Sequence, residues 1–142
     1  MAVQIVEEDK PFRRIKRSAI KEMVKGVIEQ EEKKVGDVSI VFGSDQFLLD
    51  INKRFLNRDY LTDVISFDYE EEGQISGDIL ISVDRVKDNA TQFGVSFPEE
   101  MRRIIIHGIL HLVGYEDDSD NNKANMTARE NLYLERYRGD GE

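Results

Sequence analysis

The segment from about residue 98 to residue 113 constrains the fold more than any other part of the chain. Ser96 and Glu99 form a capping box with Pro98 in the first turn, and Gly114 follows, so the pattern predicts a helix between them. Its apolar residues surround nearly the whole axis: Ile104, Ile105, Ile106, Ile109, Leu110, Leu112 and Val113. A helix that is apolar on nearly all sides must be covered by other elements, so we expect it at the centre of the fold.

The rest of the chain alternates between strand and helix patterns. Strands are expected at about residues 3–6, 38–42, 63–69 and 77–83, and the turn at 70–73 joins the last two as a hairpin. Helices are expected at about 12–34, at 45–56 after the N-cap Ser44, from Ser82 or Asp84 to 93, and at 120–137. The last is polar except for Ala124, Leu132 and Leu134. Four strands and about five helices predict an α/β (α+β) fold with a mixed four-stranded sheet.

Composition limits the protein class. A length of 142 residues suits one domain, 1–142. The chain has no cysteine, which excludes disulfides, thiolate catalysis and Cys-based metal sites and fits a reducing compartment. No apolar stretch approaches the roughly 20 residues that span a bilayer, and residues 1–10 lack the apolar core of a signal peptide, so a cytoplasmic protein is expected. The net charge of −9 argues against a general nucleic-acid binder.

The two histidines of the chain both lie on the apolar helix. His107 and His111 are four residues apart, which places their rings on one face at a separation that lets both bind one metal ion. Gly114 ends the helix and lets the chain turn back, so Asp117 is the candidate third ligand, with Asp118 as the alternative offset by one residue. The other interpretation is that both histidines are hydrogen-bonded core residues without a metal.

The spacing from His107 to Asp117 is that of metzincin metalloproteases, which carry a glutamate as general base beside the first histidine. Gly108 stands at that position here. A glycine would leave room near the metal but supplies no base, which argues against a peptidase of that type.

These residues resemble the signature of a known family. The string His-Gly-Ile-Leu-His-Leu-Val-Gly-Tyr-Glu-Asp at 107–117 is similar to the signature His-Gly-x-Leu-His-Leu-x-Gly-Tyr-Asp-His of the YbeY family of bacterial endoribonucleases and rRNA maturation factors. The segments Asp-Val-Ile-Ser-Phe at 63–67 and Gly-Asp-Ile at 77–79 resemble two strands of the same family. The resemblance extends over the chain from about residue 37 onward.

The resemblance implies a zincin-like fold with the metal helix beneath the sheet. It also implies a zinc-dependent endoribonuclease specific for single strands, which matures the 3′ end of small-subunit ribosomal RNA and acts in ribosome quality control. The implied partners are ribosomal RNA and the small subunit or its assembly factors. Oligomeric state stays open.

Two departures from the family pattern matter. The third ligand is Asp117 where the family has histidine; carboxylate oxygen still binds zinc, but a two-histidine, one-carboxylate set also suits Fe, Mn or Ni. In the family an arginine following a tyrosine is implicated in catalysis, whereas here Leu61 follows Tyr60. Arg58 is the candidate for that role, and a solvated loop residue is the other interpretation.

The mechanism expected from the resemblance is cleavage of an RNA phosphodiester. The metal would act as a Lewis acid on a phosphate oxygen, and Arg58 would stabilise the developing charge. Asp118 and Asp117 are the carboxylates available as general base; metal hydroxide and the substrate 2′-hydroxyl remain alternative nucleophiles. Competing functions are a metal-stabilised ribosome-assembly adaptor without turnover, a zincin-like hydrolase of another substrate, and a plain binding domain.

Basic residues gather locally despite the acidic total. One cluster begins the first predicted helix: Arg13, Arg14, Lys16, Arg17 and Lys21. Arg102 and Arg103 precede His107 by one turn and are candidate substrate-binding residues. We expect weak, salt-sensitive binding to bare RNA, with targeting supplied by the ribosome or a partner.

Overall fold

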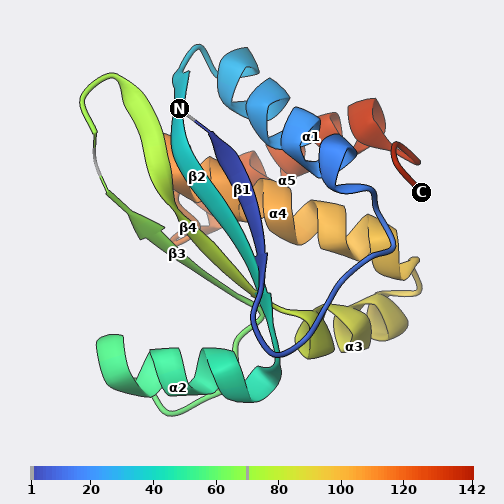
Figure 1. Cartoon of the computed structure of the whole chain (residues 1–142). Coiled ribbons are helices and arrows are strands. Elements are labelled where there is room, and N and C mark those ends of the chain that lie inside the picture. The colour runs from blue at the N-terminus through green and yellow to red at the C-terminus, as the bar shows by residue number, and fades with distance from the viewer. Residues whose placement is uncertain (1, 70) are drawn as a thin grey trace.

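The computed structural model describes residues 2–69 and 71–142. The predicted order of four strands and five helices is confirmed (Figure 1). In chain order the elements are β1 (Val3–Glu7), α1 (Arg17–Gln30), β2 (Lys34–Gly43), α2 (Asp45–Phe55), β3 (Val64–Asp68), β4 (Gln74–Ser82), α3 (Val83–Phe93), α4 (Phe97–Val113) and α5 (Asp120–Tyr137). No helix in the described residues is long and apolar enough to cross a membrane.

The strands form one mixed sheet in the order β1-β2-β4-β3. The strands β1, β2 and β4 run parallel, joined through α1 and α2, whereas β3 pairs antiparallel with β4 as the predicted hairpin. Because β3 is an edge strand, one of its sides remains open. Helix α4 contacts β3, and the candidate site described below is lined by residues of both elements.

Helices cover both faces of the sheet (Figure 1). On one face, α1 and α4 pack against inward-pointing residues of β2 and β4, and α5 packs outside α4. On the other face, Leu48 of α2 joins Ile65 and Leu80 in a smaller cluster. The large core therefore lies between the sheet and α4, as the sequence of that helix predicted.

Helix α4 is held against the sheet at its midpoint by a glycine. A Cβ atom at Gly108 would lie 2.7 Å from Cγ2 of Ile79 on β4, which is closer than side chains pack. Gly108 is therefore required for contact between the helix and the sheet. The expectation that it leaves room beside the metal is wrong, because this face of α4 points to β4 and the histidines lie on another.

Two helices differ from the sequence prediction. Helix α1 starts at Arg17 rather than near residue 12, because Phe12 is drawn into the core and packs edge-on against Phe97 at 5.1 Å. On α5 the expected apolar residues Ala124 and Leu132 are exposed. Its inward face carries Met126, Glu130, Tyr133 and Leu134 instead. The hydrogen-bonding roles of Glu130 and Tyr133, described below, explain why polar groups occupy that face.

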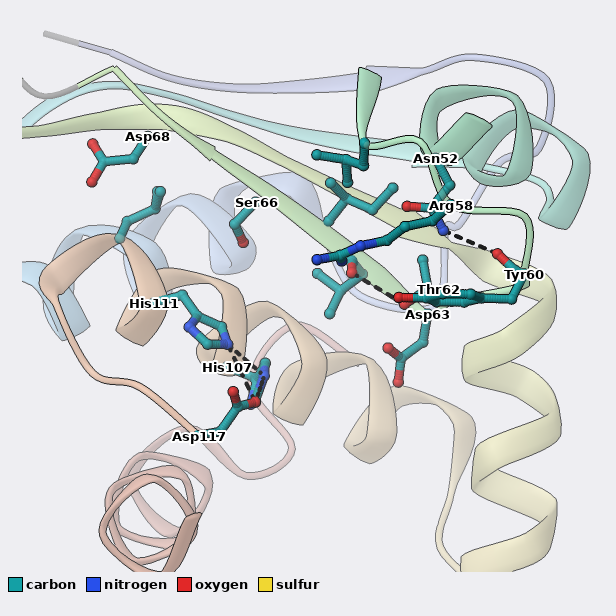
Figure 2. A pocket seen from close by; sticks show the side chains of 14 residues that line it. Asn52, Arg58, Tyr60, Thr62, Asp63, Ser66, Asp68, His107, His111 and Asp117 are labelled. Carbon is teal, nitrogen blue, oxygen red and sulfur yellow. Dashed lines mark hydrogen bonds and ion pairs between the residues drawn. The ribbon is translucent and has the colours of Figure 1, made fainter. Parts of the chain in front are cut away.

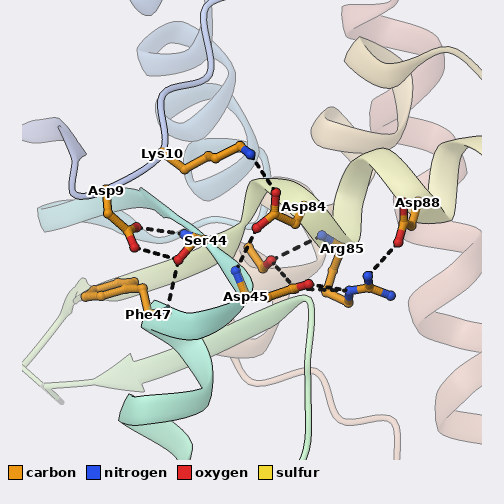
Figure 3. A network of polar contacts seen from close by, with 9 residues as sticks. Asp9, Lys10, Ser44, Asp45, Phe47, Asp84, Arg85 and Asp88 are labelled. Carbon is orange, nitrogen blue, oxygen red and sulfur yellow. Dashed lines mark hydrogen bonds and ion pairs between the residues drawn. The ribbon is translucent and has the colours of Figure 1, made fainter.

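A network of polar side chains joins the start of α2 to the start of α3 (Figure 3). The Ser82 hydroxyl accepts from the Arg85 amide, which caps α3, and donates to Asp45 at 2.7 Å. The backbone amide of Asp45 in turn donates to the Asp84 carboxylate at 2.9 Å. Because each helix start supplies a partner to the other, the network fixes α2 at the carboxyl ends of β2 and β4 and thereby positions the loop that follows α2.

Candidate metal centre

His107 and His111 lie one turn apart on the side of α4 that the sheet leaves uncovered. Their Nε2 atoms are 3.1 Å apart, and their rings meet edge-on. Both side chains are mostly covered, with exposed fractions of 23% and 31%. The i, i+4 spacing therefore produces the convergence of rings that the sequence predicted.

Asp117 completes a group of three donors. Gly114 ends α4 with a φ of 123°, a conformation that favours glycine, and the chain reverses so that residues 115–119 return along the helix. Asp117 Oδ2 then lies 3.5 Å from the Nε2 atom of each histidine (Figure 2).

The spacing of these three donor atoms matches a metal coordination shell. Bonds of about 2.0–2.2 Å in a tetrahedral zinc site place neighbouring donors roughly 3.3–3.6 Å apart. The observed separations of 3.1 and 3.5 Å lie close to that range without any rearrangement. Within the described residues, the group of His107, His111 and Asp117 is the one cluster whose ligand atoms converge in this way, and it offers three protein ligands.

A second ring of contacts orients both imidazoles. Nδ1 of His107 lies 2.6 Å from Oε2 of the buried Glu130, and Nδ1 of His111 lies 3.1 Å from the backbone oxygen of Tyr115. Both of these partners are oxygen atoms that accept a hydrogen bond, so each ring carries its proton on Nδ1. The Nε2 lone pair of each ring then points toward the other two donor atoms. Carboxylate and carbonyl partners of this kind are typical of metal-binding histidines.

Two glutamates, the buried Glu130 and the partly buried Glu31, anchor this second ring. Glu130 also accepts from Arg103 at 2.9 Å, so its carboxylate is held between a cation and His107. Glu31, at the end of α1, accepts from the hydroxyls of Tyr115, at 2.7 Å, and Tyr133. The contact with Tyr115 fixes the residue whose carbonyl faces His111.

More acidic than basic side chains lie near the candidate metal centre. The pKa values of His107 and Glu100 are both raised there. Burial alone lowers the pKa of the His107 imidazole, but the hydrogen bond and charge of Glu130 outweigh it, so the net pKa is raised. Burial raises the pKa of the Glu100 carboxyl to about 7; Arg103 opposes this shift, and the charges of Asp63 and Glu130 add to it.

The three donors form one wall of a pocket of about 540 Å³ (Figure 2). The opposite wall comes from β3 and from the loop between α2 and β3. Besides the three donors, the polar residues that line the pocket as a whole are Asn52, Arg58, Tyr60, Thr62, Asp63, Ser66 and Asp68, and the apolar ones are Leu56, Val64, Ile65 and, on α4, Leu112. The edge strand and the metal helix thus enclose a cavity that is much larger than one ion.

Of the two candidate catalytic residues, Arg58 lies at the pocket and Asp118 lies outside it. Arg58 lines the pocket, and its guanidinium has no ion-pair partner among residues 2–69 and 71–142. Asp118 does not line the pocket; it is exposed and accepts from Asn122 at 2.7 Å. Its role as alternative ligand or base is therefore not supported, because the turn that directs Asp117 inward directs Asp118 toward α5.

The expected substrate contacts of Arg102 and Arg103 need correction. Arg102 is 2% exposed and pairs with Glu142 at 2.7 Å and with the Asp140 carbonyl, so its guanidinium fastens the C-terminus to α4. Arg103 is paired with Glu130 and Asn131. Both cations are already neutralised or saturated by the protein, which leaves neither free for a phosphate. The earlier basic cluster is also partly neutralised, since Arg13 and Arg17 share Glu7.

Sequence reasoning missed four residues of the site. Glu130 lies 23 residues from His107 and gave no motif signal. Tyr60, Asp63 and Ser66 line the pocket, and the alternation of β3 placed Ser66 on the same side as Val64 without showing that this side is the open edge. Asp63 accepts from Asn89 on α3 at 3.1 Å, so its side chain also fastens the start of β3.

Fold and site together define a class: α+β proteins in which the central helix and the turn after it carry a two-histidine, one-carboxylate metal centre beside an edge strand. A family model described as Endoribonuclease YbeY matches residues 4–138. A relative of that name from Parabacteroides distasonis is 44% identical over 134 residues, which are 94% of each chain. Another from Flavobacterium johnsoniae is 48% identical over 112 residues, 79% of this chain and 81% of the relative.

A solved structure agrees with these matches. The solution structure of TM1509 from Thermotoga maritima superposes with a TM-score of 0.70 and 29% identity, covering 96% of this chain and 89% of that one. The chain belongs to the endoribonuclease YbeY family.

Proposed function

We propose that this protein is a metal-dependent endoribonuclease that cleaves single-stranded RNA and matures the 3′ end of small-subunit ribosomal RNA. Membership of the family supports the reaction class, because the family model covers residues 4–138 and includes the whole site. The single observation that carries the proposal is the convergence of His107, His111 and Asp117 within one pocket.

Zinc is the metal that we propose for the centre, at one ion per chain. The donor set fits it in ligand type and spacing, while the carboxylate ligand also accommodates Fe, Mn or Ni. When bound, such an ion supplies Lewis-acid activation of a phosphate oxygen and lowers the pKa of a coordinated water.

The chain's own residues have separate tasks. Glu130 holds the proton on Nδ1 of His107, so that Nε2 keeps its lone pair toward the centre. Arg58 provides an unpaired cation on the opposite wall, where it would bind a substrate phosphate and stabilise charge that develops on it. Figure 2 shows the Arg58 side chain extending from its loop toward the side of the pocket that carries the histidines.

The competing functions fit less well. A purely structural metal in an assembly adaptor requires a closed shell of four protein ligands, whereas the described residues offer three beside a pocket. A peptidase of the metzincin type requires a glutamate at the position of Gly108, where the contact with Ile79 leaves no space for a side chain.

The net charge of −9 bears on partners. With Arg102 and Arg103 engaged by partners of the protein itself, Arg58 is the one lysine or arginine among the described residues that line the pocket. We therefore propose that affinity for bare RNA is weak and salt-sensitive, and that the cytoplasmic small ribosomal subunit or an assembly factor brings the substrate to the site.

The test is a cleavage assay with end-labelled RNA, one strand unpaired and the same strand fully paired. Zinc-loaded protein is expected to cut the unpaired RNA and spare the duplex, and both chelation and His111→Ala should abolish cutting. Intact unpaired RNA after incubation with fully loaded protein, under conditions in which a control nuclease cuts, would contradict the proposal.

A further inference from the structure

The pocket extends beyond the metal centre. Its volume of about 540 Å³ reaches from His107 and His111 to the loop of residues 57–62, and its far end is lined by Tyr60, Thr62 and Leu56. A metal-bound phosphate would fill only the end beside the histidines. The remaining space adjoins an aromatic ring and an unpaired arginine.

Tyr60 is exposed in a way that core packing does not explain. Its side chain is 54% exposed although it borders a cavity with apolar lining residues. Figure 2 shows Tyr60 and Arg58 both extending from the loop toward the interior of the pocket. A free aromatic face at such a place is the usual platform for an unpaired nucleobase.

The loop that carries both residues is braced rather than loose. Asn52 is 1% exposed. Its side-chain amide donates to the Tyr60 carbonyl at 3.0 Å, and its backbone carbonyl accepts from the Arg58 backbone amide at 3.0 Å. Asn57 takes a left-handed φ of 52°, which turns the chain after α2, immediately before Arg58. One buried asparagine thus fixes the backbone at both residues before any ligand arrives.

We propose that Tyr60 forms a base-stacking subsite for one unpaired nucleotide of the RNA, next to the phosphate that Arg58 contacts. The proposal rests on the proposed function and adds the part of the substrate that is recognised. In a duplex both faces of a base are covered by its stacked neighbours, so a base must leave the helix before it can lie against the Tyr60 ring. Because every base has a π-face, the subsite selects for single strands without selecting for sequence.

The comparison with Phe93 separates this role from simple exposure. Phe93 ends α3 and is 65% exposed, yet it does not line the pocket. Phe93→Ala is therefore the matched control for Tyr60→Ala: each variant removes one exposed aromatic ring, but only one of them borders the cavity.

The first experiment measures binding alone, with protein that has been stripped of metal so that no cleavage occurs. Short single-stranded RNA carrying 2-aminopurine reports stacking through fluorescence quenching. Tyr60→Ala should lose the quenching and weaken binding by about fivefold to 150-fold, as expected for the loss of one base stack. Tyr60→Phe should retain both, since it keeps the ring, and Phe93→Ala should match the parent protein.

The second experiment follows cleavage with zinc-loaded protein. Tyr60→Ala should raise KM for unpaired RNA with a smaller effect on kcat, and Tyr60→Phe should restore the parent KM. Quenching and KM that are unchanged in Tyr60→Ala would overturn the subsite, even if the parent protein cuts RNA. Failure of the parent protein to cut, with quenching intact and dependent on Tyr60, would instead overturn the nuclease proposal and retain the subsite.

Discussion

Two clusters of polar side chains among the described residues differ in how their acceptor atoms are satisfied. In the network between α2 and α3, protein donors face each carboxylate: Asp9 accepts from the amide and hydroxyl of Ser44, and Asp84 accepts from the Asp45 amide and pairs with Lys10 at 2.8 Å. The hydrogen bond from Ser44 lowers the pKa of Asp9, and that from Lys10 lowers the pKa of Asp84.

The metal centre is built in the opposite way. Its three donor atoms turn toward one another, because Glu130 and the Tyr115 carbonyl occupy the other nitrogen of each histidine. Nearby, burial raises the pKa of Glu100 to about 7, whereas the pKa values of Asp9 and Asp84 in the network are lowered. The comparison shows two uses of clustered acceptor atoms. Where protein donors bind every carboxylate, the cluster connects elements of the fold. Where acceptor atoms face one another, the cluster is arranged to bind a cation.

The largest expected effect follows from removing a ligand of the centre. His111→Ala leaves His107 and Asp117 as the ligands, so metal binding and RNA cleavage should both fall below detection while the fold remains. Elemental analysis and the RNA assay measure the two effects together, and circular dichroism checks the fold. Cleavage that persists in His111→Ala without bound metal would show that the convergent cluster is not the reactive centre.

The raised pKa of Glu100 predicts a pH effect on stability. A carboxyl whose folded pKa of about 7 exceeds the ordinary 4.5 keeps its proton in the native state while the unfolded chain loses it. Stability conferred by the protonated group is therefore lost as the pH rises from 4.5 to 7, and the loss levels off above that. At about 1.4 kcal/mol per pKa unit, Glu100→Gln should gain up to about 3 kcal/mol on the parent over this window.

Urea unfolding of metal-stripped protein at a series of pH values measures this gain. Nearly equal free energies of unfolding for parent and Glu100→Gln at pH 4 and a clear advantage for the variant at pH 8 are expected. A difference that stays constant with pH would place Glu100 among satisfied carboxylates such as those of the network.

Glu130 tests whether the second ring of contacts orients the metal ligands. Glu130→Gln keeps the size of the side chain but removes the charge that faces Nδ1 of His107 and Arg103. Zinc affinity or turnover should drop about 10- to 100-fold, in the range known for such partners of metal-binding histidines. Competition with a chromophoric chelator measures the affinity, and an unchanged value would reduce Glu130 to a packing role.

The smallest effect belongs to the network and should leave activity untouched. Ser82→Ala removes a helix cap and the bond to Asp45, so it should cost about 1–2 kcal/mol of unfolding free energy. Ser96→Ala, which removes only the cap of α4, is the matched control at about 1 kcal/mol. A loss of metal affinity in Ser82→Ala would show that the two clusters are coupled.

Local patterns predicted most of the fold. The caps at Ser44 and Ser96, the helix-ending Gly114 and the hairpin all act within a few residues, so the order of elements and the central position of α4 could be predicted from the sequence. The predicted start of α1 was wrong because Phe12 packs against residues far along the chain. This burial overrides the helical periodicity of the sequence there.

The same distinction between local and long-range contacts applies to the site. His107, His111 and Asp117 lie within one helix and its following turn, so spacing alone brought them together as a hypothesis. Glu130, Glu31 and Tyr60 reach the centre from other elements, and no local pattern shows which strand edge or helix end they will meet. Arg102 was predicted to bind substrate because the sequence shows its charge but does not show that it pairs with Glu142 at the C-terminus.

The most direct test of the account is a zinc titration of chelator-stripped protein by calorimetry, with Asp117→Ala measured alongside the parent. Asp117 is decisive because it departs from the family signature and comes from the turn rather than the helix. We expect one zinc per chain in the parent protein and a large loss of zinc affinity in Asp117→Ala. Equal binding by the two proteins, or none by the parent, would contradict the assignment of the centre.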